Sequence, residues 1–460
     1  MAGIFSSEDE ETKIMDAELF KKYKKMGREL IPKGKEFSLW KGMYSAMLAQ
    51  TKDQPLGPFI EMMLNIFLDV GKARTEGRPL IMHTFNYGPE IFYAMDIMPL
   101  MQELFSVGLA PVRMNEYYID ITDEMGFGDN PTICNASRPL IGAYFKEVAP
   151  IPDLLFFTST PCNSIAITYQ VFQHLVGDLP TFNMDIPYWE FDPNREVFKE
   201  FYDEKTLGYI LSQSKDLIAW LEKNTKHKFN EEKFKQTMGY LNQARENIME
   251  FNELLKAKPC PINSMGGFSN WFTMVLTGGT RTAVDVTKAM RDTAARNVKK
   301  GVGGVPDEKL RIAWPYIHVF FDEMGLFPYL EKNFNAVTIM DLLGYYPVPS
   351  HSTASIDECF ESLAKGTLDM SMVGSCRGPA EFYIDHVVRW VKDYKCDCVV
   401  IPMQFACKHN YAMLRITAEV VREETGIPTL IFGCDPFDAR EVPAETIRGR
   451  IAEFLTEVVM

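Results

Sequence analysis

Short apolar runs alternate with segments of helical period through most of this 460-residue chain. Runs such as 79–83, 154–157 and 398–402 are each followed by a polar turn and then by an amphipathic stretch. A recurring order of strand, turn and helix makes neighbouring strands parallel, because each helix carries the chain back to the same edge of the sheet. The sequence therefore predicts an α/β fold of doubly wound parallel sheets, in other words Rossmann-like domains.

The chain is longer than one hydrophobic core normally supports, so more than one domain is expected. Strand signals cluster in two regions that are separated by a long stretch of mixed charged and apolar residues with helical period. We predict a helical N-terminal segment at 1–75, a first Rossmann-like domain at 76–190, a helical insert and linker at 191–304, and a second Rossmann-like domain at 305–460.

Local patterns add four expectations about individual elements. Two amphipathic stretches in the N-terminal segment predict helices, one with Leu19, Phe20, Tyr23 and Met26 on a single face and one at 58–70. A helix is expected at 91–98, directly after the first strand and its turn. Glycine and proline punctuate 258–306, which predicts a linker with one helix near 282–297. The stretch between the strand at 337–340 and a helix at 379–394 reads as a loop.

Composition limits the classes of partner. The formal net charge is -14, and a nucleic-acid binder needs clustered Lys and Arg to meet phosphates. The longest apolar runs fall short of the roughly 18 residues that a membrane-spanning helix requires. The acidic start of the chain does not resemble a signal or transit peptide. The sequence therefore predicts a cytoplasmic protein that binds neither nucleic acid nor membrane.

Three of the nine cysteines occupy settings suited to chemistry. Cys162 and Cys407 each follow an apolar strand by a few residues and come just before a helix, where the helix dipole and free N–H groups should lower a thiol pKa. Cys134 lies 28 residues before Cys162 and also leads into a helix. Because ligands bind at the carboxyl ends of parallel strands, all three could meet in a crevice between the two sheets.

Packing remains the alternative for each cysteine, since a lone buried Cys is more often core than ligand. The spacings match no short zinc or ferredoxin signature. Cys434 could reach the same edge and is the strongest rival of the three. Cys396 and Cys398 read as core residues. The remaining cysteines, which have no visible partner in the sequence, are Cys260, Cys359 and Cys376.

Other candidate sites are weaker. The chain has no Walker loop for ATP, and the glycines at 301–304 are better explained by a flexible linker than by a dinucleotide-binding loop. Glu90 follows a strand-end turn, which makes it a candidate acid or base. An exposed carboxylate that starts a helix is the alternative for Glu90.

Four stretches together resemble the family of 2-hydroxyglutaryl-CoA dehydratase (2-hydroxyacyl-CoA dehydratase) and benzoyl-CoA reductase subunits. The likeness covers residues 76–190 and 305–460. The stretches that carry it are Pro-Asp-Leu-Leu-Phe-Phe-Thr-Ser-Thr-Pro-Cys162-Asn, the run 179–189, Cys398-Val-Val-Ile-Pro-Met-Gln-Phe-Ala-Cys407-Lys, and 426–440 with Cys-Asp435-Pro-Phe-Asp438-Ala-Arg440.

The resemblance implies an iron–sulfur subunit. Cys134, Cys162 and Cys407 would bind three irons of a [4Fe-4S] cluster and leave the fourth iron without a protein ligand. A larger double-cubane cluster is the variant within the same fold. The resemblance also implies a homologous second subunit, in a heterodimer or a higher heteromer.

The reaction implied by the resemblance uses electrons from a separate ATP-hydrolysing iron–sulfur activator, which agrees with the missing Walker loop here. Single low-potential electrons would pass through the cluster to an acyl-CoA thioester, which then loses a 2-hydroxyl group or has an aromatic ring reduced. Glu90 would handle protons. Two rival functions stay open: a double-cubane reductase of small molecules, and a non-catalytic partner subunit that relays electrons or only supports the catalytic chain.

Overall fold

The computed structural model describes residues 42, 44–49, 51–52, 56–73, 76–127, 133–146, 149–177, 179–189 and 203–460. The predicted helix face of Leu19, Phe20, Tyr23 and Met26 lies outside them. The second predicted N-terminal helix is confirmed as α3 (Gly57–Lys72), whose buried face packs on the rest of the molecule.

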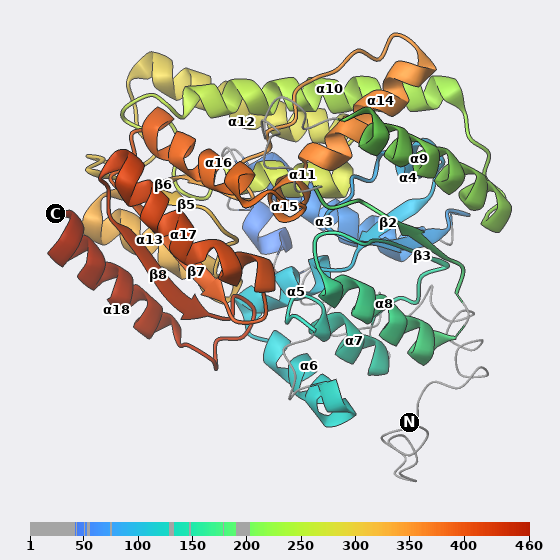
Figure 1. Ribbon diagram of the computed structural model, residues 1–460, viewed down its shortest axis with the longest axis horizontal. Helices are drawn as coiled ribbons and strands as arrows, with labels where there is room; N and C mark the ends of the chain where they lie inside the picture. The colour runs from blue at the N-terminus through green and yellow to red at the C-terminus, as the bar shows by residue number, and fades with distance from the viewer. Residues whose placement is uncertain are drawn as a thin grey trace.

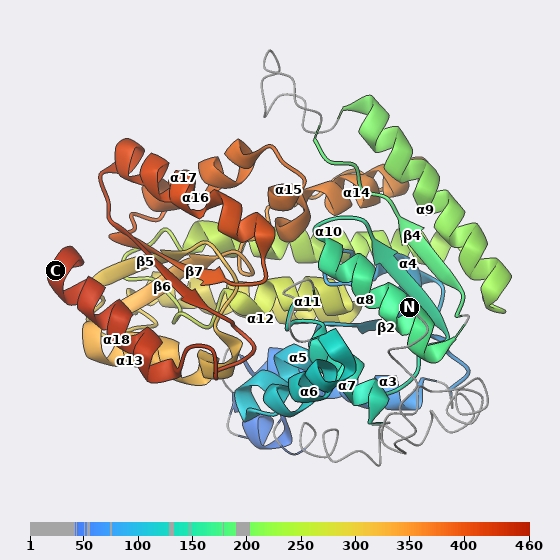
Figure 2. The same ribbon diagram turned by 60° about the horizontal axis from the view of Figure 1, so that its bottom comes forward.

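Two four-stranded parallel sheets form the centre of the fold (Figures 1 and 2). The first has the order β2-β1-β3-β4 and the second the order β6-β5-β7-β8. The strands are β1 (Leu80–His83), β2 (Met98–Met101), β3 (Leu154–Thr158), β4 (Thr181–Met184), β5 (Leu310–Trp314), β6 (Ala336–Asp341), β7 (Cys398–Gln404) and β8 (Thr429–Cys434). The predicted α/β class is confirmed, and the two sheets are compatible with two Rossmann-like domains. The exact domain boundaries remain predictions.

In each sheet the strand order reverses between the two central strands. These are β1 and β3 in the first sheet and β5 and β7 in the second. A crevice for ligands opens at such a reversal, outside the carboxyl ends of the strands. Helix α8 (Asn163–Val176) packs on β3 of the first sheet, and α7 (Arg138–Phe145) packs against α8. Around the second sheet lie α13 (Glu323–Phe334), α16 (Ala380–Asp393), α17 (Lys408–Thr425) and α18 (Ala444–Phe454).

The stretch between the sheets is helical, as predicted. Figure 1 shows α10 (Glu231–Leu254) across the top of the molecule, where it contacts α4 (Glu90–Ala94) of the first half and α14 (Ile356–Asp369) of the second. Helix α12 (Arg281–Lys300) packs against α10, and α9 (Glu204–Asn224) packs against α14 and β4. The smaller elements of the first half are α5 (Leu104–Leu109), a 3-10 turn (Ala110–Val112), α6 (Asn115–Thr122) and a π turn (Asp123–Phe127). Those of the second half are a 3-10 turn (Phe320–Asp322) and a π turn (Leu455–Val459).

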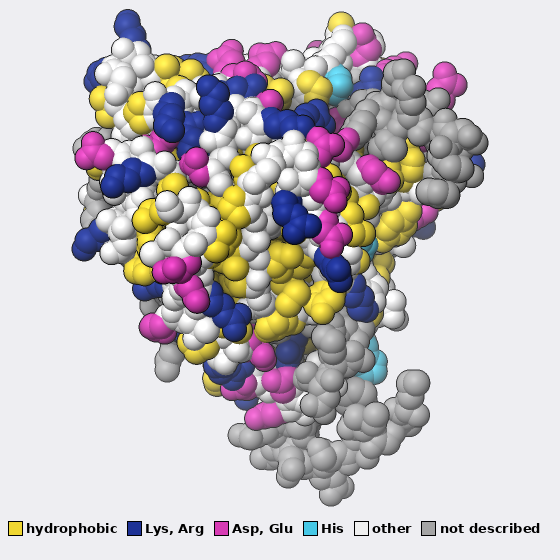
Figure 3. Space-filling view, turned by 60° about the vertical axis from the view of Figure 1, so that its left-hand side comes forward, with side chains coloured by type: hydrophobic (Ala, Val, Ile, Leu, Met, Phe, Trp, Pro, Cys, Tyr) yellow, Lys and Arg dark blue, Asp and Glu magenta, His cyan; other side chains and the backbone are white. Residues whose placement is uncertain are grey.

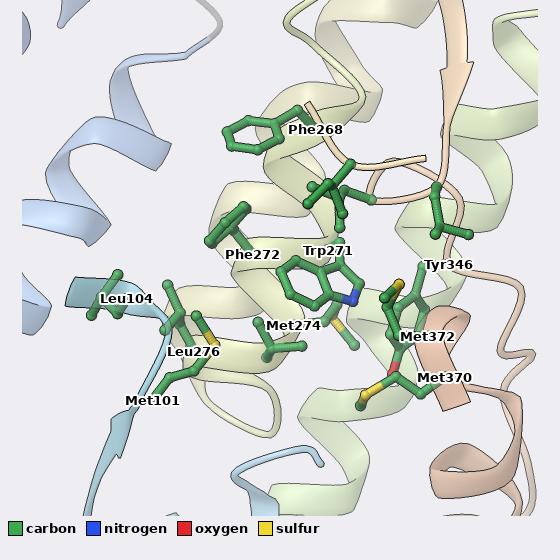
Figure 4. Packing of buried hydrophobic residues seen from close by; sticks show 14 of the residues in the cluster. Met101, Leu104, Phe268, Trp271, Phe272, Met274, Leu276, Tyr346, Met370 and Met372 are labelled. Carbon is green, nitrogen blue, oxygen red and sulfur yellow. The ribbon is translucent and has the colours of Figure 1, made fainter. Parts of the chain in front are cut away.

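The predicted linker at 258–306 is wrong in one respect, because it contains a second helix, α11 (Phe268–Thr277). Every residue of α11 is buried, and Figures 1 and 2 both place it between the two sheets. Glycine pairs at 266–267 and 278–279 flank this short helix, and that punctuation favours a linker in the sequence. Figure 4 shows Phe268, Trp271 and Phe272 on α11, within the core that joins the two halves.

The predicted helix at 91–98 is also wrong at its end. α4 (Glu90–Ala94) is short, and the chain then enters β2. Pro99 pairs with Ile81 of β1, and β2 is the edge strand, where a missing N–H is tolerated.

The predicted loop before the helix at 379–394 contains two helices, α14 (Ile356–Asp369) and α15 (Ser371–Cys376). A capping box formed by Ser355 and Glu358 starts α14: Ser355 Oγ accepts the Glu358 N–H, and the Glu358 carboxylate accepts the Ser355 N–H.

The surface carries both signs of charge. On the face in Figure 3, Lys and Arg lie among Asp and Glu, with hydrophobic side chains between them. Within the described part of the chain, no helix is long and apolar enough to cross a membrane.

Candidate functional site

The three cysteines singled out in the sequence line one cavity of about 100 Å³. Cys134 and Cys162 come from the first half of the chain and Cys407 from the second. The remaining wall is largely aromatic and aliphatic, and its apolar members include Phe85, Trp271, Phe272, Ile317, Phe320 and Met372. The crevice expected between the sheets therefore exists, and it brings the predicted thiols together. Their role as cluster ligands remains a prediction.

Cys162 and Cys407 occupy corresponding places in the two sheets. Cys162 follows β3 and is the N-cap residue of α8, whereas Cys407 follows β7 and is the N-cap residue of α17. Backbone N–H groups from the first turn of each helix point at the sulfur: those of Ser164 and Ile165 at Cys162, and those of residues 409 and 410 at Cys407.

Cys134 is held against both halves. Its backbone N–H donates to Ser164 Oγ at 2.8 Å. The next residue, Asn135, donates to Asp435 Oδ2 at 3.1 Å and accepts from Arg138 at 2.9 Å. The Cys-Asn-Ala-Ser-Arg stretch is therefore tied to the turn after β8, although these residues are about 300 positions apart.

Two hydrogen bonds end on the Cys134 sulfur. The Ala136 N–H donates at 3.4 Å, and Gln404 Nε2 donates at 2.8 Å. Gln404 Oε1 in turn accepts from the Tyr316 hydroxyl at 2.7 Å. The same hydroxyl lies next to Cys407 and helps to lower the pKa of that thiol.

The expected low pKa of these thiols is wrong for the chain without metal. Burial raises the pKa of Cys162 to about 11, although N–H groups at the helix start oppose it. Burial also raises the pKa of Cys407, and it raises that of Cys134 well above its ordinary value with help from the Asp435 carboxylate. Desolvation of a thiolate outweighs the helix dipole here. A bound metal reverses this balance, because it deprotonates a coordinating thiol outright.

The donor set fits a multi-iron group better than a single ion. Among the described residues, no three His, Cys, Asp or Glu side chains converge to hold one metal ion. Yet Cys134, Cys162 and Cys407 share one cavity and lie close enough to raise one another's pKa. In an iron–sulfur cluster each thiolate binds a different iron, so the sulfurs need not meet at one point.

A fourth thiol lines the same cavity. This thiol belongs to Cys376, the last residue of α15. The sequence does not indicate it as a ligand, because it has no visible partner there. Its pKa is raised by burial and then by the neighbouring Cys407 and Cys162. The rival Cys434 ends β8 and does not line the cavity. The unpredicted α15 explains why Cys376 was missed.

Glu103 is the carboxylate of the cavity, and sequence reasoning missed it. Its side chain is buried, and burial raises its pKa to about 8. Oε2 accepts the Phe85 N–H at 3.1 Å, while Oε1 is buried without a hydrogen-bond partner among the described residues. The signal was its place just past β2, but the predicted helix at 91–98 concealed that strand.

Glu90 lies elsewhere and does not line the cavity. It starts α4 as expected but is buried rather than exposed. Burial raises its pKa, and the positive charge of Arg245 on α10 opposes that rise. The carboxylate fits against glycine: a Cβ at Gly278 would lie 3.1 Å from Glu90 Oε1. These contacts describe a packed junction between α4, α10 and the turn after α11.

Comparison with known proteins gives one family. The family described as 2-hydroxyglutaryl-CoA dehydratase, D-component, matches residues 84–457. The (R)-phenyllactyl-CoA dehydratase alpha subunit of Clostridium sporogenes is 22% identical over 398 residues, 85% of this chain and 91% of that protein. The (R)-2-hydroxyisocaproyl-CoA dehydratase alpha subunit of Clostridioides difficile is 23% identical over 417 residues, 87% and 94% of the two chains.

The (R)-2-hydroxyglutaryl-CoA dehydratase subunit alpha of Acidaminococcus fermentans is 24% identical over 313 residues, which are 67% of this chain and 61% of that protein. Identity is therefore low, while the family match extends from the turn after β1 to within three residues of Met460. The family match includes the strands that deliver the cysteines and the turns that hold them. The protein belongs to the 2-hydroxyglutaryl-CoA dehydratase, D-component, family, as its sequence motifs predicted.

Proposed function

We propose that this chain is the iron–sulfur subunit of an acyl-CoA dehydratase that removes water from a 2-hydroxyacyl-CoA thioester. The observation that carries the proposal is the shared cavity of Cys134, Cys162, Cys407 and Glu103. Dehydration is favoured over ring reduction because the relatives compared above are dehydratase alpha subunits.

Cys134, Cys162 and Cys407 would hold a [4Fe-4S] cluster, which supplies single low-potential electrons when it is bound. The two helix starts and Gln404 direct N–H groups at the sulfurs, which stabilises thiolates that burial alone would disfavour. The apolar wall keeps water away from them.

Glu103 would handle the protons of the reaction. Loss of water removes the 2-hydroxyl group and a proton from the neighbouring carbon, so one group must protonate the leaving oxygen and one must accept the carbon-bound proton. With a pKa of about 8, Glu103 is mostly protonated at neutral pH. It can donate its proton to the leaving hydroxyl and then accept one, and Oε1 is the free oxygen for this exchange.

The cavity wall suggests the class of acyl group. Trp271, Phe272 and Phe320 face the cavity, and Lys408, its one Lys or Arg side chain among the described residues, is exposed. Such a wall suits an aromatic or branched apolar acyl chain better than one with a second carboxylate. Phenyllactyl-CoA should therefore be a better substrate than 2-hydroxyglutaryl-CoA.

The proposal includes two partners. The relatives are alpha subunits, so a second, homologous subunit is expected beside this chain. A separate ATP-hydrolysing activator would supply the electrons, as the family resemblance implies. Association of partners would cover part of the surface around the cavity, where Phe405 and Tyr411 are exposed.

Iron and sulfide analysis of the anaerobically purified complex tests the proposal. We expect about four irons and four sulfides per copy of this chain, following the cluster type. Cys162→Ser should lose the cluster absorption, whereas Cys396→Ser, a buried cysteine away from the cavity, should keep it. An iron-free intact complex would refute the proposal.

Cys376 favours a second candidate function, that of a relay subunit. A cluster bound by four thiolates has no iron free for substrate, so it could only pass electrons onward. The EPR spectrum of this subunit's cluster separates the two functions. A 2-hydroxyacyl-CoA should change that spectrum if the cavity binds substrate and should leave it unchanged in a relay.

A further inference from the structure

Gln404 and Tyr316 form a buried polar pair between the cysteines. Gln404 is the last residue of β7, and Tyr316 lies two residues past the end of β5. They are 2% and 3% exposed. β5 and β7 are neighbours in the second sheet, so the pair lies at the point where the strand order of that sheet reverses.

The hydrogen bonds of the pair lead to sulfur. The Gln404 amide donates to Cys134 Sγ at 2.8 Å and accepts from the Tyr316 hydroxyl at 2.7 Å. The Tyr316 hydroxyl also lies next to Cys407 and lowers the pKa of that thiol. Cys134 and Cys407, which come from different halves of the chain, thus lie on either side of the Gln404–Tyr316 pair.

The orientation of the amide follows from the chemistry of its neighbours. A thiolate, or a sulfur bound to iron, accepts hydrogen bonds and donates none, so the NH₂ group must face Cys134. Oε1 then faces Tyr316, whose hydroxyl has a proton to donate. The reverse orientation would place the amide oxygen against the sulfur and lose that bond, because neither atom has a proton to donate. The sulfur therefore sets the direction in which Gln404 donates, and Tyr316 supports it by donating to Oε1 at 2.7 Å.

A purely structural role would account less well for this pair. A buried amide that only completes the core can bond to backbone groups or hydroxyls, as Gln102 does when it donates to Ser137 Oγ at 2.6 Å. The Gln404 side chain instead uses its donor on a thiol, which is a weak acceptor until it is deprotonated. The bond gains strength only when the sulfur carries negative charge.

We propose that Gln404 is a positioning residue that holds Cys134 and sets the reduction potential of the cluster through its N–H···S hydrogen bond, with Tyr316 as the residue that supports its amide. The inference rests on the proposed function, because it requires the cluster. Reduction adds negative charge to the sulfurs, so a donor stabilises the reduced form more than the oxidised form. The bond therefore raises the reduction potential.

The direct test is an EPR-monitored redox titration of the anaerobic complex with Gln404→Met, which keeps the length and bulk but removes the donor. We expect the equilibrium to shift about tenfold toward the oxidised cluster, which is about 59 mV more negative for one electron. Tyr316→Phe should shift the potential in the same direction by less, since the amide is still present but no longer supported at Oε1.

Gln102→Met is the matched control, because Gln102 is a buried glutamine whose amide donates to a hydroxyl. Its potential should equal that of the wild type. Equal potentials for wild type, Gln404→Met and Tyr316→Phe, all with full iron content, would overturn the inference and leave the proposed function standing. If Gln404→Met loses iron, the potential of Tyr316→Phe decides: an unchanged value overturns the inference, and a lower value supports it. A wild-type complex without iron would instead overturn the proposed function itself.

Discussion

Glu103 and Glu90 show how strongly the surroundings of a residue determine its chemical role. They are buried carboxylates with raised pKa values, and they lie 13 positions apart in the chain. Glu103 lines the cavity and has a buried oxygen without a hydrogen-bond partner among the described residues, whereas Glu90 is enclosed by glycines and faces the charge of Arg245. Sequence position favoured Glu90, and the geometry favours Glu103.

Substitution of each glutamate separates these roles. Glu103→Gln should lower the dehydration rate about 10²- to 10⁴-fold, the usual contribution of a general acid or base. Iron content should stay at the wild-type level. Glu90→Gln is the matched control and should change the rate far less. The measurement is kcat for 2-hydroxyacyl-CoA with the activator present; a larger loss for Glu90→Gln would reverse the assignment.

Cys376 can be tested in the same manner. If Cys134, Cys162 and Cys407 are the ligands, Cys376→Ser should keep its iron and its EPR signal. If Cys376 is a fourth ligand, the signal should change, because a serine oxygen or water would replace one sulfur. Iron analysis and EPR of the variant therefore choose between the dehydratase subunit and the relay.

At the level of secondary structure, the ten-residue helix α11 contributes to both the hydrophobic core and the cavity wall. It is buried throughout, and it supplies Trp271 and Phe272 to the cavity. Figure 4 shows its side chains packed toward Met101 on one side and Met372 on another. A helix in this position couples the shape of the cavity to the packing of both sheets.

Methionine substitutions measure that contribution. Met274→Ala on α11, where the side chain is 1% exposed, should destabilise the protein by about 2–5 kcal/mol. Met324→Ala on α13, where the side chain is 61% exposed, should stay within about 0.5 kcal/mol. The midpoint of denaturant unfolding reports the difference. Equal midpoints for the two variants would show that α11 is not part of the cooperative core.

For the molecule as a whole, buried acids make stability depend on pH. Burial raises the pKa of Asp435 to about 7 and that of Glu103 to about 8. An acid with a raised folded pKa favours folding fully below its unfolded pKa, and this contribution is lost as pH rises through the folded value. The loss should fall between about pH 4 and pH 8, because the carboxylate must then ionise inside the protein.

The comparison of wild type with Glu103→Gln isolates this effect. Wild-type unfolding midpoints should fall between pH 5 and pH 8 more steeply than those of the variant, which keeps Asp435 but has a neutral amide at position 103. Parallel curves would mean that Glu103 reaches water in the folded protein. Measurements on cluster-free protein avoid interference from iron loss.

The amino-acid sequence alone was sufficient to predict the α/β class, most strands and the convergence of Cys134, Cys162 and Cys407 on one crevice. Their signals are local: an apolar run, a turn and the start of a helix occupy adjacent residues, as at β3, Cys162 and α8. Helix α11 was missed because glycine pairs flank it, and the edge strand β2 was missed because it follows α4 almost directly and contains Pro99. Without them, Glu103 could not be placed at the cavity.

The remaining features of the site depend on contacts between residues far apart in the chain. Gln404 reaches Cys134 across 270 positions, and Asn135 reaches Asp435 across 300. No local pattern encodes such pairs, since they form only when two sheets pack around a shared helix. The same burial reversed the expected pKa of the thiols, because desolvation depends on the whole surrounding structure and outweighs the helix dipole that the sequence could reveal.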